Sequence, residues 1–188
     1  MKKVLGFIAL LGCVVASGAQ AAVPKGWFIT GSAAADYDIG TEPGTRGAGD
    51  NNAFIRARKD TTGFGTLMQT IDASVYRGKR VRFSGFLRTK DANQAGLWMR
   101  VDGAYKRILG FDNMEKRAVH GDSDWQRYTI VLDVPQEAVD IAFGFLLNGK
   151  GEVSADDFKL EIVNHDVATT DMPHPQLPNA PVNLNFSL

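Results

Sequence analysis

Short stretches in which apolar and polar residues alternate follow one another from Trp27 to Val163. Residues 97–102 alternate until Gly103, and residues 126–134 alternate until Pro135 ends the pattern. A period of two, bounded by glycine, proline and polar turns, is typical of β-strands with one buried side. Further strands are expected at residues 26–30, 53–58, 65–71, 81–88, 141–148 and 157–162. No window has a helical period of useful length, so the pattern predicts an all-β fold of about eight antiparallel strands, a sandwich or a barrel.

The first 21 residues have the pattern of a secretory signal peptide. Two lysines precede an uncharged apolar run over residues 4–16, and Ala19 and Ala21 match an A-x-A cleavage site. Residues 10–13 also resemble a lipobox, so lipidation at Cys13 is an alternative, although the apolar run continues past the cysteine. We expect cleavage after Ala21 and a periplasmic or secreted protein without a membrane span.

The length of 188 residues suits one domain, which we place at residues 24–164, followed by a tail at residues 165–188. Four of the seven prolines lie in this tail, which predicts an extended backbone. The tail ends in a strict alternation from Val182 to Leu188. This pattern predicts a terminal strand that pairs with a sheet edge of its own domain or of a second copy. A truncated linker is the alternative.

Charge and cysteine content narrow the function classes. Basic and acidic residues number 21 each, so the chain lacks the basic footprint of a nucleic-acid-binding protein, and no nucleic-acid partner is expected. Cys13 is the only cysteine, which leaves the cleaved form without disulfides or thiolate ligands. The three histidines are far apart and no serine lies in a G-x-S-x-G motif. We therefore assign no catalytic residue and favour a protein that is not an enzyme.

A candidate recognition face follows from the alternation. If Leu97, Met99 and Val101 face the core, Trp98, Arg100 and Asp102 face the other way. In residues 81–88 the same argument places Arg82, Ser84, Phe86 and Arg88 opposite the apolar side. If both stretches share a sheet, these side chains line one face, to which Asn148 adds an amide beside the space left by Gly144. The candidate ligand-binding residues are Arg82, Phe86, Arg88, Trp98, Arg100, Asp102 and Asn148.

Aromatic rings, arginines and carboxylates of this kind suit sugars, which stack on rings and whose neighbouring hydroxyls accept forked hydrogen bonds from arginine and donate them to carboxylates. The alternative is structural. A loop at residues 111–114 would then cover Trp98, and Arg100 and Asp102 would form a buried ion pair. Trp27 and Trp125 are expected to pack in the core or at its rim.

Five segments, GLWMRVDG, FDNM, DWQRYTIVLDVP, IAFGFLLNGKGEV and DDFKLEIV, resemble a bacterial family of exported jelly-roll domains. Its members are similar to carbohydrate-binding modules and galactose-binding-like domains, and some are labelled transcriptional regulators. The resemblance covers residues 27–163 and implies a jelly-roll β-sandwich. Related domains often have a tryptophan where this chain has Ser154, and they have a segment like PVNLNF before the first Gly-Trp rather than at residues 181–186.

Similar jelly rolls often hold a structural calcium, for which Asp156 and Asp157 are the candidate ligands, with oxygen atoms of residues 36–38 as a second possibility. A solvated acidic turn is the alternative, because no EF-hand-like spacing is present. No other cofactor is expected.

Together these features predict a non-catalytic, exported module that binds a carbohydrate or cell-envelope glycan through the face around Trp98. The alternative is a periplasmic structural or interaction protein that uses its terminal strand. A hydrolase of unrecognised type comes third.

Overall fold

The computed structural model describes residues 23–44, 46–47, 51–171 and 180–186. These residues form nine strands, three single-turn 3-10 helices and no α-helix, which confirms the predicted all-β class. The strands are β1 (Phe28–Thr30), β2 (Tyr37–Pro43), β3 (Asn51–Ala57), β4 (Phe64–Asp72), β5 (Lys79–Gly103), β6 (Ile108–Asp112), β7 (Val119–Val134), β8 (Ala138–Asn148) and β9 (Glu152–Val163). The 3-10 helices are η1 (Ala34–Asp36), η2 (Ala104–Lys106) and η3 (Glu115–Arg117).

The predicted signal peptide, with Cys13 and Ala21, lies outside the described residues. Within the ranges that are described, no helix has the length and apolar character needed to cross a membrane.

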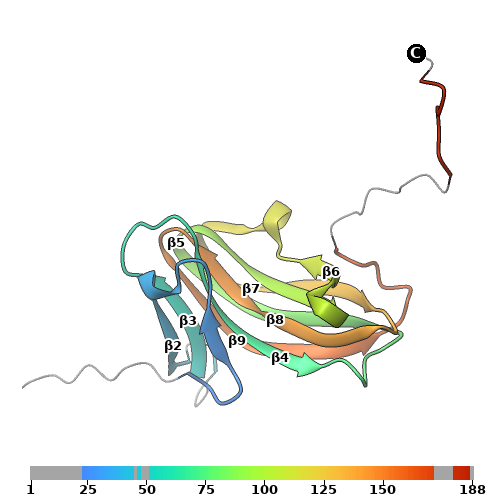
Figure 1. The fold of residues 1–188 in the computed structure, drawn as a ribbon. Helices are drawn as coiled ribbons and strands as arrows, with labels where there is room; N and C mark the ends of the chain where they lie inside the picture. Colours follow the sequence, from blue (N-terminus) through green and yellow to red (C-terminus); the bar gives the residue numbers. More distant parts are fainter. Residues whose placement is uncertain (1–22, 45, 48–50, 172–179, 187–188) are drawn as a thin grey trace, which may run out of the picture.

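All strand pairs are antiparallel, in the order β1-β4-β8-β5-β9-β3-β2, and β6 and β7 also pair with β5 (Figure 1). The long strand β5 joins the two halves of the sheet. Its first arm, residues 79–90, lies between β7 and β9, and its second arm, residues 94–103, lies between β8 and β6. Between the arms the register with β7 shifts repeatedly and Asp91 has a φ of 48°, as expected where bulges bend a strand.

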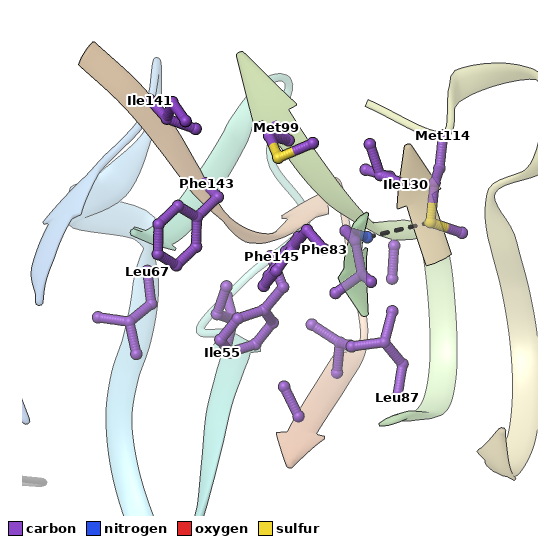
Figure 2. Packing of buried hydrophobic residues seen from close by; sticks show 14 of the residues in the cluster. Ile55, Leu67, Phe83, Leu87, Met99, Met114, Ile130, Ile141, Phe143 and Phe145 are labelled. Atoms are coloured by element: carbon purple, nitrogen blue, oxygen red, sulfur yellow. Dashed lines mark hydrogen bonds between the residues drawn. The ribbon is translucent and has the colours of Figure 1, made fainter. Parts of the chain in front are cut away.

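Both arms of β5 turn their apolar side to one core. Val81, Phe83 and Leu87 of the first arm and Leu97, Met99 and Val101 of the second are fully buried in the same cluster. This confirms the alternation predicted for both stretches. In Figure 2, side chains from several strands point toward one another, and the rings of Phe83 and Phe143 lie 5.0 Å apart. Burying a side chain of this size stabilises a fold by about 1.5–3 kcal/mol.

The start of the tail is held against the body. Arg80 Nη1 donates hydrogen bonds to the carbonyl oxygens of His165 and Val167, at 2.8 and 2.6 Å. The amide of Thr170 donates to the carbonyl of Val131 at 2.8 Å, and the amide of Val131 donates to Thr170 Oγ1 at 2.9 Å. Residues up to 171 therefore continue along the outer edge of β7.

The end of the tail differs from the predicted strand. Residues 180–186 are exposed and contain a turn in which the amide of Phe186 donates to the carbonyl of Asn183 at 3.0 Å; no strand is formed in this part of the described chain. Alternation alone does not supply the ladder hydrogen bonds that a strand requires. Residues 187 and 188 lie outside the described residues, and self-association through the segment from Val182 to Leu188 stays a prediction.

Candidate functional site

A groove of about 620 Å³ lies over β1, β4, β8 and the second arm of β5. Its lining residues on β4 and β5, such as Met68 and Trp98, alternate with core residues such as Leu67 and Leu97. The groove therefore lies on the outer side of the sheet, away from the core.

Cross-strand register arranges the groove in rows. One row runs from Phe28 through Met68 and Gly144 to Trp98. A second row joins Phe64, Asn148 and Gln94. A third joins Thr70, Ala142 and Arg100. Each row brings side chains that are distant in the sequence onto one surface.

The hollow exists because the central strand has small residues there. At Gly144 a Cβ atom would lie 2.2 Å from the carbonyl oxygen of Leu67, so only glycine fits between β4 and β5. Ala142 packs with Met68 and Trp98 in a small cluster of its own, flanked by Phe111 and Leu146. This cluster forms the floor of the groove.

Trp98 is a fixed part of that floor. Its side chain is 8% exposed, and its Nε1 donates to Thr66 Oγ1 at 2.8 Å. The hydroxyl of Thr66 in turn donates to the carbonyl of Phe145 at 2.7 Å. Phe111 packs against the same cluster, as the structural interpretation of residues 111–114 predicted in part.

The accessible aromatic rings of the groove are instead Phe28 and Phe64, which are 44% and 37% exposed. Both were missed as site residues from the sequence. Phe64 directly precedes the expected strand at residues 65–71, and Phe28 lies in the short expected strand at residues 26–30. The only available signal was an aromatic residue at each strand end, which is equally typical of core packing.

Arg100 and Asp102 form a close ion pair. Nε of Arg100 lies 2.9 Å from both carboxylate oxygens of Asp102, and Nη2 lies 2.7 Å from Oδ2. The Asp102 side chain is 1% exposed and does not line the groove, whereas the Arg100 side chain is 36% exposed and does. Asp102 therefore positions Arg100, as the structural interpretation expected, and Arg100 borders the groove.

Amide and hydroxyl groups complete the lining. Asn148 Nδ2 donates to Gln94 Oε1 at 3.2 Å, and Thr30, Thr70 and Asn113 border the same hollow. Of the predicted ligand-binding residues, Trp98, Arg100 and Asn148 are brought together here.

Arg82, Phe86 and Arg88 belong to the first arm of β5 and do not line this groove. Arg82 pairs with Glu161 at 3.1 Å. The guanidinium of Arg46 lies 3.4 Å from the centre of the Phe86 ring, and that of Arg88 lies 5.1 Å from the Trp125 ring. Because the bend places the two arms in different halves of the sheet, the single recognition face expected from the sequence is divided in two.

Arg88 borders a separate polar hollow of about 600 Å³, with the buried Ser154. Its ionisable groups carry both signs: Arg88 and Lys90 lie with Asp122, Asp124 and Glu152. Glu152 accepts hydrogen bonds from Arg56 at 2.8 and 3.0 Å. These bonds are the main reason why the pKa of Glu152 is lowered. This carboxylate is thus already engaged by the protein.

The candidate calcium ligands have protein partners. Asp156 Oδ2 accepts from Arg46 Nε at 3.1 Å, and its Oδ1 accepts from the amide of Asp157 at 2.7 Å. Both residues border an apolar slot of about 420 Å³ beside Trp27 and Phe158. Across the described ranges, no group of three or more His, Cys, Asp or Glu side chains is arranged to hold a metal. A calcium ion at this position stays a prediction.

Comparison with solved structures identifies the architecture. The CBM22-1 xylan-binding domain of Paenibacillus barcinonensis Xyn10C superimposes with a TM-score of 0.57 at 11% identity, over 77% of this chain and 90% of that domain. A CBM4 structure gives a TM-score of 0.51 at 19% identity, over 73% of this chain and 86% of the other. The fold is the jelly roll of carbohydrate-binding modules. The predicted jelly roll, and the resemblance behind it, are confirmed at the level of fold.

At the level of sequence, no family model matches. A Bacillus subtilis (strain 168) protein named uncharacterized HTH-type transcriptional regulator YbfP is 39% identical over 166 residues. The match covers 86% of this chain and 56% of that protein, so this chain spans little more than half of its relative's length. The name agrees with the label expected for some relatives. The absence of a nucleic-acid partner for this chain stays a prediction.

Proposed function

We propose that this protein is a non-catalytic, exported carbohydrate-binding module and that the groove above Trp98 holds a glycan. The observation that carries the proposal is an open groove on the outer side of the sheet that combines exposed aromatic rings with amides and hydroxyls. Pockets for small ligands are typically about 300–1,000 Å³, which includes the volume of this groove. The solved xylan-binding domain of the same fold supports a sugar as the ligand, and the N-terminal signal pattern supports export.

The lining suits the two kinds of surface that a sugar ring presents. Phe28 and Phe64 offer ring faces to the apolar C–H side of a sugar. Gln94, Asn148 and Arg100 offer donors or acceptors to its hydroxyls.

The floor beneath the ligand is already ordered, because Trp98 is held by Thr66 and the Arg100 guanidinium by Asp102. A site that is ordered before binding loses less conformational entropy when the ligand arrives. We therefore expect a groove that changes little when the ligand binds.

The test is binding of the full chain to a panel of polysaccharides and oligosaccharides by affinity electrophoresis and calorimetry. We expect Phe64→Ala and Phe28→Ala each to weaken binding of a recognised glycan by about fivefold or more, in the range of one lost stacking contact. Phe186→Ala is the matched control, since it removes an exposed phenylalanine from the tail. Failure to bind any glycan, or equal loss in all three variants, would reject the groove.

A second candidate is an interaction protein of the periplasm that uses its tail. The supporting observation is that Val182, Leu184 and Phe186 are all exposed at alternating positions. Deleting residues 182–188 and comparing the oligomeric state by sizing chromatography with light scattering tests this function. An unchanged monomer at all concentrations, with and without the tail, would reject it.

A further inference from the structure

The ionisable residues that line the groove carry only positive charge. Arg100 and Lys106 are the two such residues, and no Asp or Glu of the described chain contributes to the lining. Composition does not explain this, because acidic and basic residues are equally numerous. Three other hollows do contain carboxylates, such as Asp36 and Asp60 beside η1, Asp156 beside Trp27 and Glu152 beside Arg88.

The guanidinium of Arg100 is held by Asp102 through two of its three nitrogen atoms. Asp102 engages its Nε and Nη2, and Nη1 makes no hydrogen bond or ion pair to any described residue. Because Asp102 is buried and Arg100 is partly exposed, the pair keeps the guanidinium at the groove wall. A donor fixed in this way suits a single acceptor oxygen of high charge density.

Lys106 is the uncompensated charge of the groove. It is exposed and forms no ion pair with any residue that the structure describes. Its position depends on an unusual turn, in which Tyr105 and Lys106 both have left-handed φ values, 56° and 60°. The amide of Gly103 donates to the carbonyl of Arg107 at 2.7 Å and closes this turn. Consecutive left-handed residues other than glycine cost energy, and such strain is concentrated at functional sites.

We propose that the groove selects acidic glycans, whose uronic-acid carboxylate binds near Lys106 and Arg100, over neutral glycans of the same backbone. This inference rests on the proposed carbohydrate-binding function and adds a ligand class to it. Lys106 supplies the net charge, while Nη1 of Arg100 supplies a directed donor. A neutral sugar would leave the charge of Lys106 without a partner in the groove.

The test compares glycans of the same backbone with and without free uronic-acid carboxylates, with the full chain and calorimetry as readout. Three pairs serve: oligogalacturonate and its methyl ester, glucuronoxylan and unsubstituted xylan, and cellulose oligosaccharides with and without oxidation at C6. We expect the acidic member of at least one pair to bind more tightly by fivefold or more. The advantage should shrink as ionic strength rises, since exposed charges are screened.

Lys106→Gln should weaken the acidic glycan about fivefold and leave the neutral partner unchanged, as expected for one exposed charge at contact distance. Lys79→Gln is the matched control, because Lys79 is exposed on β5 outside the groove.

Equal affinity for both members of every pair, or equal weakening of both by Lys106→Gln, would overturn the acidic preference and leave the carbohydrate site standing. Tighter binding of a sulfated form of the same backbone would overturn the assignment to uronic acids. No binding to either member of any pair would instead count against the proposed function itself.

Discussion

The indole Nε1 of Trp98 and the hydroxyl of Thr66 form a 2.8 Å hydrogen bond between β5 and β4. The Thr66 hydroxyl in turn donates a hydrogen bond to the carbonyl of Phe145 at 2.7 Å, so the two bonds reach across β8, which lies between those two strands. A buried indole N–H therefore has its partner, and the floor of the groove has one orientation.

Replacing Thr66 by valine tests this link. Thr66→Val keeps the shape of the side chain but leaves the indole N–H buried without an acceptor, so we expect a loss of about 1–3 kcal/mol in the free energy of unfolding. Thr66→Ser, which keeps the hydroxyl, should lose less. Urea denaturation followed by tryptophan fluorescence measures both. A valine variant as stable as the wild type would mean that the bond does not contribute.

Breaking the Arg100–Asp102 pair should lower the free energy of unfolding far more than breaking the Arg82–Glu161 pair on the other arm of β5. Arg100→Met leaves the carboxylate of Asp102 buried and unpaired, which is expected to cost about 3–5 kcal/mol. Arg82→Met breaks a pair whose side chains are both more than a third exposed, for which about 0.2–1 kcal/mol is expected. Equal losses in the two variants, measured by chemical denaturation, would contradict the burial argument.

Gly144→Ala should destabilise the protein, because the new methyl group would collide with the backbone of β4 at Leu67. Overpacking of this kind typically costs about 1–3 kcal/mol, and here it would also distort the groove. Gly121→Ala is the comparison, since no atom lies within 4 Å of its Cβ position and only the left-handed φ of 67° opposes it. Thermal unfolding should rank Gly144→Ala below Gly121→Ala; the reverse order would contradict the contact.

The interaction between Arg56 and Glu152 should make part of the free energy of unfolding depend on pH. The hydrogen bonds from Arg56 lower the pKa of Glu152 from its ordinary 4.5. A carboxyl group whose pKa is lower in the folded state stabilises the fold above its unfolded value and loses that contribution as the pH falls through the folded value. The melting temperature of Arg56→Gln should therefore lie below that of the wild type at pH 7. The difference should shrink as the pH falls below 4.5, and a difference that stays constant to lower pH would contradict the linkage.

Period-two alternation is a local property, and for this reason the sequence predicted which residues of β5 face the core, from Val81 to Val101. The partner of each stretch is not local. Nothing in residues 88–96 indicated that one strand would bend there and enter both halves of the sheet. Of the predicted ligand-binding residues, Trp98, Arg100 and Asn148 therefore lie together, whereas Phe86 and the arginines of the first arm lie elsewhere.

Two strands were not expected at all. Strand β2 contains Gly40 and β6 contains Gly110, and β6 has only five residues. Both are strands because a neighbour, β3 or β5, supplies the hydrogen bonds, which is a tertiary effect that short windows of sequence do not contain.

The strand order also determines which strand pairs can form while the chain is still being synthesised. Strand β4 pairs with β8, β3 pairs with β9, and every partner of β5 follows it in the sequence. A nascent chain that has emerged only as far as residue 103 can therefore form two isolated strand pairs, β1 with β4 and β2 with β3, but no closed core. Long-range pairing of this kind folds slowly and leaves apolar segments uncovered meanwhile. Most of the polypeptide must therefore be synthesised before its last strand, β9, can pair with β3 and β5 and complete the sheet.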